Sequence, residues 1–103
     1  MTDDLSKWKV EYTRSASKDK KKLPVGIQMQ LELLAREIEI SGPIRKSWSN
    51  FSALKKGKGI PDNAYHCHIK KGKPTYVACW VVEDKKVKLV EIYYVGTHEK
   101  APY

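Results

Sequence analysis

The stretch PVGIQMQLELLAREIEISGP, residues 24–43, decides the fold class of this chain. Its apolar residues recur at helical spacings of four, three and four positions, at Ile27, Leu31, Leu34 and Ile38. Such spacing places them on one side of an α-helix. Pro24 suits the first turn, and Ser41-Gly42-Pro43 ends the helix. The stripe therefore predicts a helix that packs on a core.

Two further elements are predicted before this helix. Residues 8–12 alternate apolar and polar side chains, which is the period of a half-buried strand. Thr13 or Ser15 can cap a short helix over residues 15–23, with lysines on its exposed side.

Three strands are predicted after residue 63, over residues 65–70, 75–82 and 86–95. Residues 44–63 show no period and form a long connection, which we expect aromatic side chains to pin to the body. The predicted fold class is α+β, with two N-terminal helices on one face of a small antiparallel-rich sheet in the order β-α-α-β-β-β. We expect residues 1–103 to form a single domain.

The chain carries a formal net charge of +8, which favours a polyanionic partner because lysines on phosphates release condensed counterions. A basic surface that only aids solubility is the alternative. The lysines predicted to bind RNA lie on the first helix, in the long connection and at the end of the first late strand: Lys20, Lys21, Lys55, Lys56, Lys58, Lys70, Lys71 and Lys73.

No apolar run approaches the roughly 20 residues that span a bilayer, so we expect no membrane association and a cytoplasmic location. Cys67 and Cys79 are the two cysteines, with no C-x-x-C motif. A disulfide framework is therefore not predicted, and both thiols are expected to be reduced.

The sequence AYHCHIKK, residues 64–71, is the chemically distinctive part of the chain. In a strand, His66, His68 and Lys70 share one face, whereas Cys67 points to the other. Cys67 therefore cannot easily join the histidines around a metal ion, and His98 is the one obvious third ligand. We predict no metal and no cofactor.

A polar face carrying two histidines beside lysines is either solvated or suited to RNA cleavage. In-line attack of a ribose 2′-hydroxyl on the adjacent phosphate needs a base, an acid and cations for the charge that develops on the phosphate. Imidazoles titrate near neutral pH, and lysines supply fixed positive charge.

The sequences EYTRSASKDKKKLP, residues 11–24, and LKKGKGIPDNAYHCHIKK, residues 54–71, together with the segment that continues to Tyr103, resemble the RelE superfamily of toxin–antitoxin ribonucleases. The resemblance implies the RelE/ParE fold and metal-independent, ribosome-dependent cleavage of messenger RNA. It also implies silencing by a cognate antitoxin protein.

The resemblance also implies which residues form the site. Two lysines of RelE-like members fall on His66 and His68, and a YafQ-like histidine in a GTH motif falls on His98. A C-terminal aromatic residue of the family falls on Tyr103, where it would stack on a base or aid proton transfer. We expect His98 to be the leading acid or base, followed by His68 and then His66, with the two roles left open.

The chain departs from the family on the next strand. Many members carry a phosphate-binding arginine where this chain has Thr75, Tyr76 or Val77, and the acidic residue of the YafQ-like branch is missing too. A non-catalytic RNA- or ribosome-binding module of the same fold therefore remains an alternative. A structural partner whose basic face only holds an acidic antitoxin is another.

Overall fold

The computed structural model describes residues 7–55 and 59–103. The elements, in chain order, are β1 (Lys9–Tyr12), α1 (Arg14–Lys22), α2 (Val25–Ser41), β2 (Ser52–Ala53), β3 (Ala64–Lys70), β4 (Tyr76–Asp84), β5 (Leu89–Thr97) and the 3-10 helix η2 (His98–Lys100). The strands form one mixed sheet in the order β1-β5-β4-β3-β2. Strand β1 pairs with β5 in parallel, and the other pairs are antiparallel.

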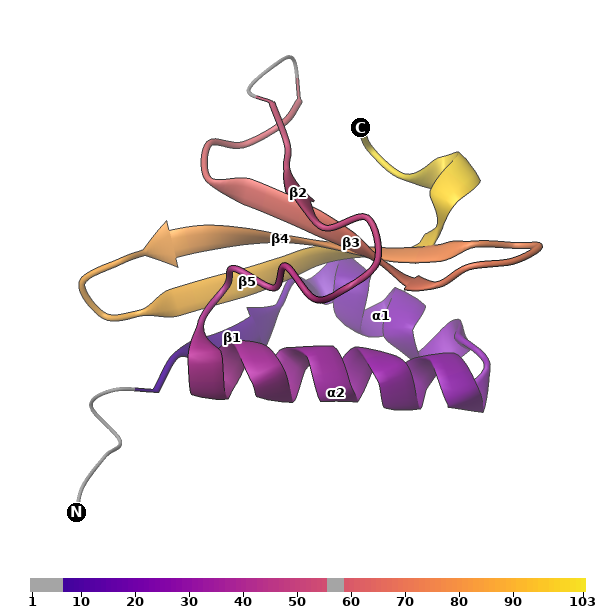
Figure 1. The fold of residues 1–103 in the computed structure, drawn as a ribbon, viewed down its shortest axis with the longest axis horizontal. Coiled ribbons are helices and arrows are strands. Elements are labelled where there is room, and N and C mark those ends of the chain that lie inside the picture. The colour runs from indigo at the N-terminus through magenta and orange to yellow at the C-terminus, as the bar shows by residue number, and fades with distance from the viewer. Residues whose placement is uncertain (1–6, 56–58) are drawn as a thin grey trace.

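The two helices cover one face of this sheet. Figure 1 shows α1 and α2 below the strands, with the yellow C-terminal segment above them. The predicted α+β class and the placement of both helices on one face are confirmed, as is the pairing of the first strand into the same sheet. None of the helices in residues 7–55 and 59–103 is long and apolar enough to cross a bilayer.

Local capping and burial explain the two helices. The Thr13 hydroxyl accepts a hydrogen bond from the Ala16 backbone N–H at 3.1 Å, so Thr13 is the cap of α1. The predicted apolar stripe of α2 is buried, with no side chain more than 4% exposed: Ile27, Leu31, Leu34 and Ile38. Burial of this stripe against the sheet holds α2 in place.

The two faces of the sheet have different roles. Cys67 pairs with Ala78 across β3 and β4, and both are fully buried in the core cluster under the helices. Cross-strand partners share a face, so His66, which pairs with Cys79, lies on the opposite side. The predicted orientation of Cys67 toward the core is confirmed, and both thiols are free and buried.

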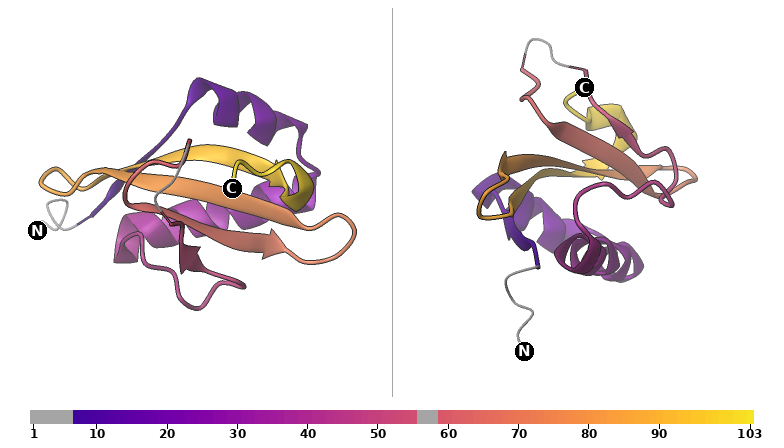
Figure 2. Two further views of the ribbon diagram at one scale, coloured as in Figure 1. Left: turned by 90° about the horizontal axis from the view of Figure 1, so that it is seen from above. Right: turned by 60° about the vertical axis from the view of Figure 1, so that its left-hand side comes forward.

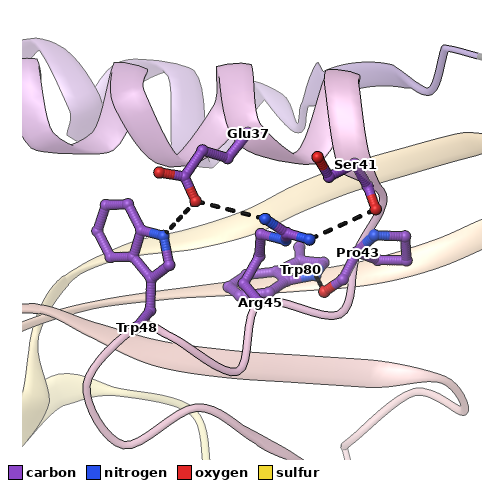
Figure 3. Close-up of polar contacts among 6 residues, drawn as sticks. All are labelled: Glu37, Ser41, Pro43, Arg45, Trp48 and Trp80. Atoms are coloured by element: carbon purple, nitrogen blue, oxygen red, sulfur yellow. Dashed lines mark hydrogen bonds and ion pairs between the residues drawn. The ribbon is translucent and has the colours of Figure 1, made fainter.

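Polar contacts fasten the segment after α2 to the helix and to the sheet (Figure 3). A Glu37 carboxylate oxygen accepts hydrogen bonds from the Trp48 indole N–H at 2.8 Å and from the Arg45 guanidinium at 3.4 Å. The indole N–H of Trp80, from β4, donates to the Pro43 carbonyl at 3.1 Å. Phe51 stacks on Trp80 with ring centroids 6.0 Å apart. The expectation that aromatic residues pin this connection is confirmed for Trp48 and Phe51.

Three sequence predictions are wrong in detail. The connection over residues 44–63 contains the short strand β2, which pairs with β3. The last two strands run further than predicted, to Asp84 and Thr97.

The third error concerns Lys70. A register shift between His68 and Lys70 interrupts the alternation, and Lys70 pairs with Tyr76, which packs against the core. Lys70 therefore lines a hollow beside Ile27 of α2 instead of sharing the face of the histidines.

Gly42, at the end of α2, should be intolerant of substitution. Its φ of 95° lies in a region that side chains rarely adopt, and a Cβ there would lie 3.2 Å from Nε1 of Trp8. We expect Gly42→Ala to lower the free energy of unfolding by about 1–3 kcal/mol in urea titrations.

Gly26→Ala is the matched control for this substitution, because a Cβ at Gly26 would meet no atom within 4 Å. It should be neutral or stabilising by at most about 1 kcal/mol. Equal effects of the two substitutions would contradict the strain assigned to Gly42.

Candidate functional site

Four rings gather on the face of the sheet that the helices leave free. The His66 and Tyr103 ring centroids are 4.5 Å apart, those of His68 and His98 are 5.4 Å apart, and those of His98 and Tyr103 are 5.9 Å apart. His66 and His68 lie 6.2 Å from each other. The structure therefore brings together all four residues that the sequence predicted to be catalytic, and we call them the ring cluster.

The backbone after β5 carries two of these rings back over the sheet. The His98 N–H donates to the Thr75 carbonyl at 2.8 Å, which ties η2 to the start of β4. The Ala101 N–H then donates to the His98 carbonyl at 3.1 Å and closes one turn. Seen from above in Figure 2, the tail turns back across the strands, and this places Tyr103 over His66.

His66 is the most enclosed of the three histidines, with 9% of its surface exposed. Its Nδ1 lies 3.2 Å from the hydroxyl of Ser52, its cross-strand partner on β2. Burial lowers the pKa of His66, a hydrogen bond to Ser52 opposes that shift, and the nearby His98 lowers the pKa further. His66 is therefore held in one orientation and favours the neutral form at neutral pH.

His68 is half-buried and His98 is exposed. Burial, followed by the neighbouring His98, His66 and Lys71, lowers the pKa of His68. The Nδ1 atom of His68 is buried without a hydrogen-bond partner in the described residues. A neutral imidazole with a free nitrogen beside an exposed imidazole is an arrangement suited to proton transfer.

Tyr103 remains a hydrogen-bond donor at neutral pH. Burial raises the pKa of the Tyr103 hydroxyl to about 12, and the nearby Cys79 thiol acts in the same direction. The ring is 40% exposed although it contacts His66, so one side of it faces solvent. An aromatic surface of this kind can stack on a base.

The predicted RNA-binding lysines do not form one surface. Lys20 lies in the helix layer, 3.9 Å from a Glu32 carboxylate oxygen and 4.7 Å from the Tyr12 ring centre. Lys21 is in the same helix, and Lys55, Lys71 and Lys73 are exposed on loops beside the sheet. Lys56 and Lys58 lie outside the described residues.

Metal binding has no support from the geometry. In residues 7–55 and 59–103, no group of three or more His, Cys, Asp or Glu side chains is arranged to hold a metal ion. The three histidines instead pack with their rings against one another and against Tyr103.

Sequence reasoning missed Ser52, which orients His66. The strand that carries it has two residues and is fixed by pairing with β3, so no periodic pattern in the sequence reveals it. Thr75, at the predicted place of the family's arginine, has its hydroxyl hydrogen-bonded to the Gly72 carbonyl at 2.9 Å and supplies no charge.

Solved structures with the same fold were found by structure comparison. A variant of Escherichia coli toxin RelE in the free state, with two arginines replaced by alanine, superposes with a TM-score of 0.65 at 23% identity and covers 92% of this chain and 87% of its own. The chain has a RelE-like fold. No family model and no curated protein sequence matches it.

Two of the RelE-like structures are complexes. The intact E. coli RelBE toxin–antitoxin complex matches with a TM-score of 0.60 at 26% identity, over 90% of this chain and 99% of that chain. The archaeal RelE–RelB complex from Pyrococcus horikoshii matches with a TM-score of 0.64 at 15% identity, over 92% and 99%. The predicted resemblance to the RelE fold is therefore confirmed.

The lowered pKa values of His66 and His68 predict acid sensitivity. Unfolded imidazoles take up protons near pH 6.5, whereas these folded ones do so at lower pH. Below about pH 6.5 the unfolded state therefore binds more protons, and the free energy of unfolding falls as the pH falls. Above about pH 7.5 both states are neutral, and the effect is absent.

The measurement is the thermal midpoint between pH 7.5 and 5.5 for the parent and for a His66→Gln/His68→Gln variant. The midpoint of the parent should fall more steeply, because only the parent carries the two depressed groups. Parallel curves would show that these histidines are not depressed in the folded state.

Proposed function

We propose that this chain is the toxin of a type II toxin–antitoxin system, a ribosome-dependent endoribonuclease that cleaves messenger RNA and stops translation. The observation that carries the proposal is the ring cluster: three imidazoles and a phenol meet on the sheet face opposite the helices. The RelE-like fold supports it.

The reaction is in-line transfer at a phosphate of the RNA. A neutral imidazole takes the proton of a ribose 2′-hydroxyl, whose oxygen attacks the adjacent phosphorus. The bond from phosphorus to the 5′-oxygen of the next nucleotide breaks, and that oxygen receives a proton from a second group. The products are a 2′,3′-cyclic phosphate and a 5′-hydroxyl, with no metal ion required.

The accessibility of each ring orders the roles. His98 is exposed at the end of β5 and is the leading proton-transfer residue. His68 lies next to it and has a depressed pKa, which suits a base. His66 is buried, hydrogen-bonded to Ser52 and covered by Tyr103, so it supports the cluster more than it meets the substrate.

Positive charge for the phosphate must come from lysine or from a protonated histidine, because no arginine follows Arg45 in the sequence. Lys71 is exposed and acts electrostatically on His68, so it is the nearest described candidate. Lys73 lies two residues further along the same turn and supplies a second fixed charge.

The alternative is a non-catalytic RNA- or ribosome-binding module of the same fold. The observation that favours it is Thr75, whose hydroxyl is closed into hydrogen bonds with Gly72 at the place where the family's arginine is expected. Such a module would block ribosomes and leave no new RNA ends.

The proposed partners are the ribosome with its messenger RNA and a cognate antitoxin protein. The antitoxin is proposed because two of the RelE-like structures are toxin–antitoxin complexes. A net charge of +8 suits both an acidic protein and RNA. If the chain served only to hold an antitoxin, the ring cluster could be altered without effect on translation.

The proton-transfer roles predict that His98→Ala and His68→Ala each lower the rate of messenger RNA cleavage on programmed ribosomes by about 10²- to 10⁴-fold. Antitoxin binding and the thermal midpoint at pH 7.5 should stay close to those of the parent. The readout is primer extension of the new RNA ends.

Cys67→Ala is the control for these variants, since Cys67 is fully buried on the helix side of the sheet. It should lower the thermal midpoint and leave the cleavage rate unchanged. New ends at the parent rate from a variant lacking all three histidines would refute the assignment. An absence of new ends with the parent itself would favour the non-catalytic module.

The lysines near the ring cluster should contribute to binding through counterion release. We expect affinity for ribosomes to fall steeply between about 50 and 200 mM salt, and Lys71→Ala to reduce the slope of that dependence. Lys86→Ala, exposed on the turn before β5, is the matched control. Identical slopes for the two variants would show that Lys71 does not contact phosphate.

A further inference from the structure

A polar hollow of about 320 Å³ lies beside the ring cluster and shares His98 with it. One wall is the β3–β4 turn and the other is the end of β5 with η2. The lining residues are Gly72, Lys73, Pro74, Thr75, Thr97, His98 and Glu99. The volume is at the small end of the range for ligand pockets, so one nucleotide is the largest ligand that suits it.

Hydrogen bonds hold the two walls together. The Thr75 hydroxyl donates to the Gly72 carbonyl at 2.9 Å and accepts from the Gly72 N–H at 3.3 Å, which closes the turn on itself. The Thr75 carbonyl accepts from the His98 N–H at 2.8 Å and so ties the turn to η2. A hollow with walls fixed in this way needs little ordering when a ligand binds.

Two opposite charges line the hollow without a charged partner of their own. In the described part of the chain, neither the Lys73 ammonium nor the Glu99 carboxylate forms an ion pair, and both residues are exposed. A ligand that satisfies both must present an anion at one end and hydrogen-bond donors at the other. A nucleotide has this character: its phosphate suits Lys73, and donors on its base suit Glu99.

We propose that this hollow is a base-reading subsite for a guanine nucleotide, with Glu99 as its specificity residue. Guanine presents a ring N–H and an exocyclic amine side by side on its Watson–Crick edge, and a carboxylate can accept both. Adenine and cytosine offer one amine on that edge, and uracil offers one ring N–H. The subsite would hold the nucleotide next to the phosphate that is cut, since His98 borders both places.

The proposal deepens the proposed function and rests on it for its place beside the cut, but nucleotide binding can be tested without cleavage. The probe is 5′-GMP, with AMP, CMP and UMP for comparison, titrated at millimolar concentration into the labelled protein and followed by amide NMR. GMP should shift the amides of Gly72, Thr75 and Thr97 and should bind more tightly than the other three.

Glu99→Gln should weaken GMP binding by about tenfold, in line with the 1–3 kcal/mol that a bidentate contact to a base contributes to discrimination, and should leave AMP binding unchanged. Lys73→Ala should weaken all four nucleotides alike. The controls are Glu32→Gln and Lys86→Ala, which remove the same charges from exposed positions that do not line the hollow.

Equal affinity of the parent and Glu99→Gln for GMP would overturn the proposal, as would an absence of shifts at Gly72, Thr75 and Thr97. On ribosomes, Glu99→Gln should relax the preference for guanine beside the cut. If the parent binds GMP in the hollow and cleaves nothing, the proposed endoribonuclease function fails while the subsite stands. If the parent cleaves and GMP shifts none of these amides, only the subsite fails.

Discussion

The hydrogen bond from the Trp80 indole to the Pro43 carbonyl is the contact on which the free face of the sheet depends. Trp80 is fully buried, so its N–H would lose about 1–3 kcal/mol if it had no partner. The partner is supplied by the first residues after α2, which must therefore lie against β4. Phe51 then stacks on Trp80, and the chain reaches β3 in position to form β2. Ser52 meets His66 as a result.

The sheet separates the work of folding from the work of the site. On the helix side, β3 and β4 bury Cys67, Ala78 and Trp80 against α2. On the other side the same strands carry His66 and His68, whose neighbours are the rings of the C-terminal segment. A change in the ring cluster thus leaves the main core intact, and partial burial under Tyr103 is still enough to depress the pKa of His66.

The sequence predicted the parts of the fold that rest on a repeated pattern. The spacing of Ile27, Leu31, Leu34 and Ile38 placed α2 correctly, and alternation placed Cys67 and His66 on opposite faces. Alternation failed at Lys70, because a bulge adds a residue and no local signal announces it. β2 has only two residues, and it exists because the segment after α2 is held against the sheet.

The ring cluster was within reach of the sequence only as a set of residue types. Alternation puts His66 beside His68, but the return of His98 and Tyr103 over them depends on the hydrogen bond between His98 and Thr75. That bond also explains how the chain does without an arginine on β4. Thr75 is engaged in closing the β3–β4 turn and fixing η2, and the turn carries Lys71 and Lys73 beside His98 and His68. Positive charge at this site thus comes from a turn whose shape Thr75 sets, so the charge and the imidazoles are positioned by the same residue.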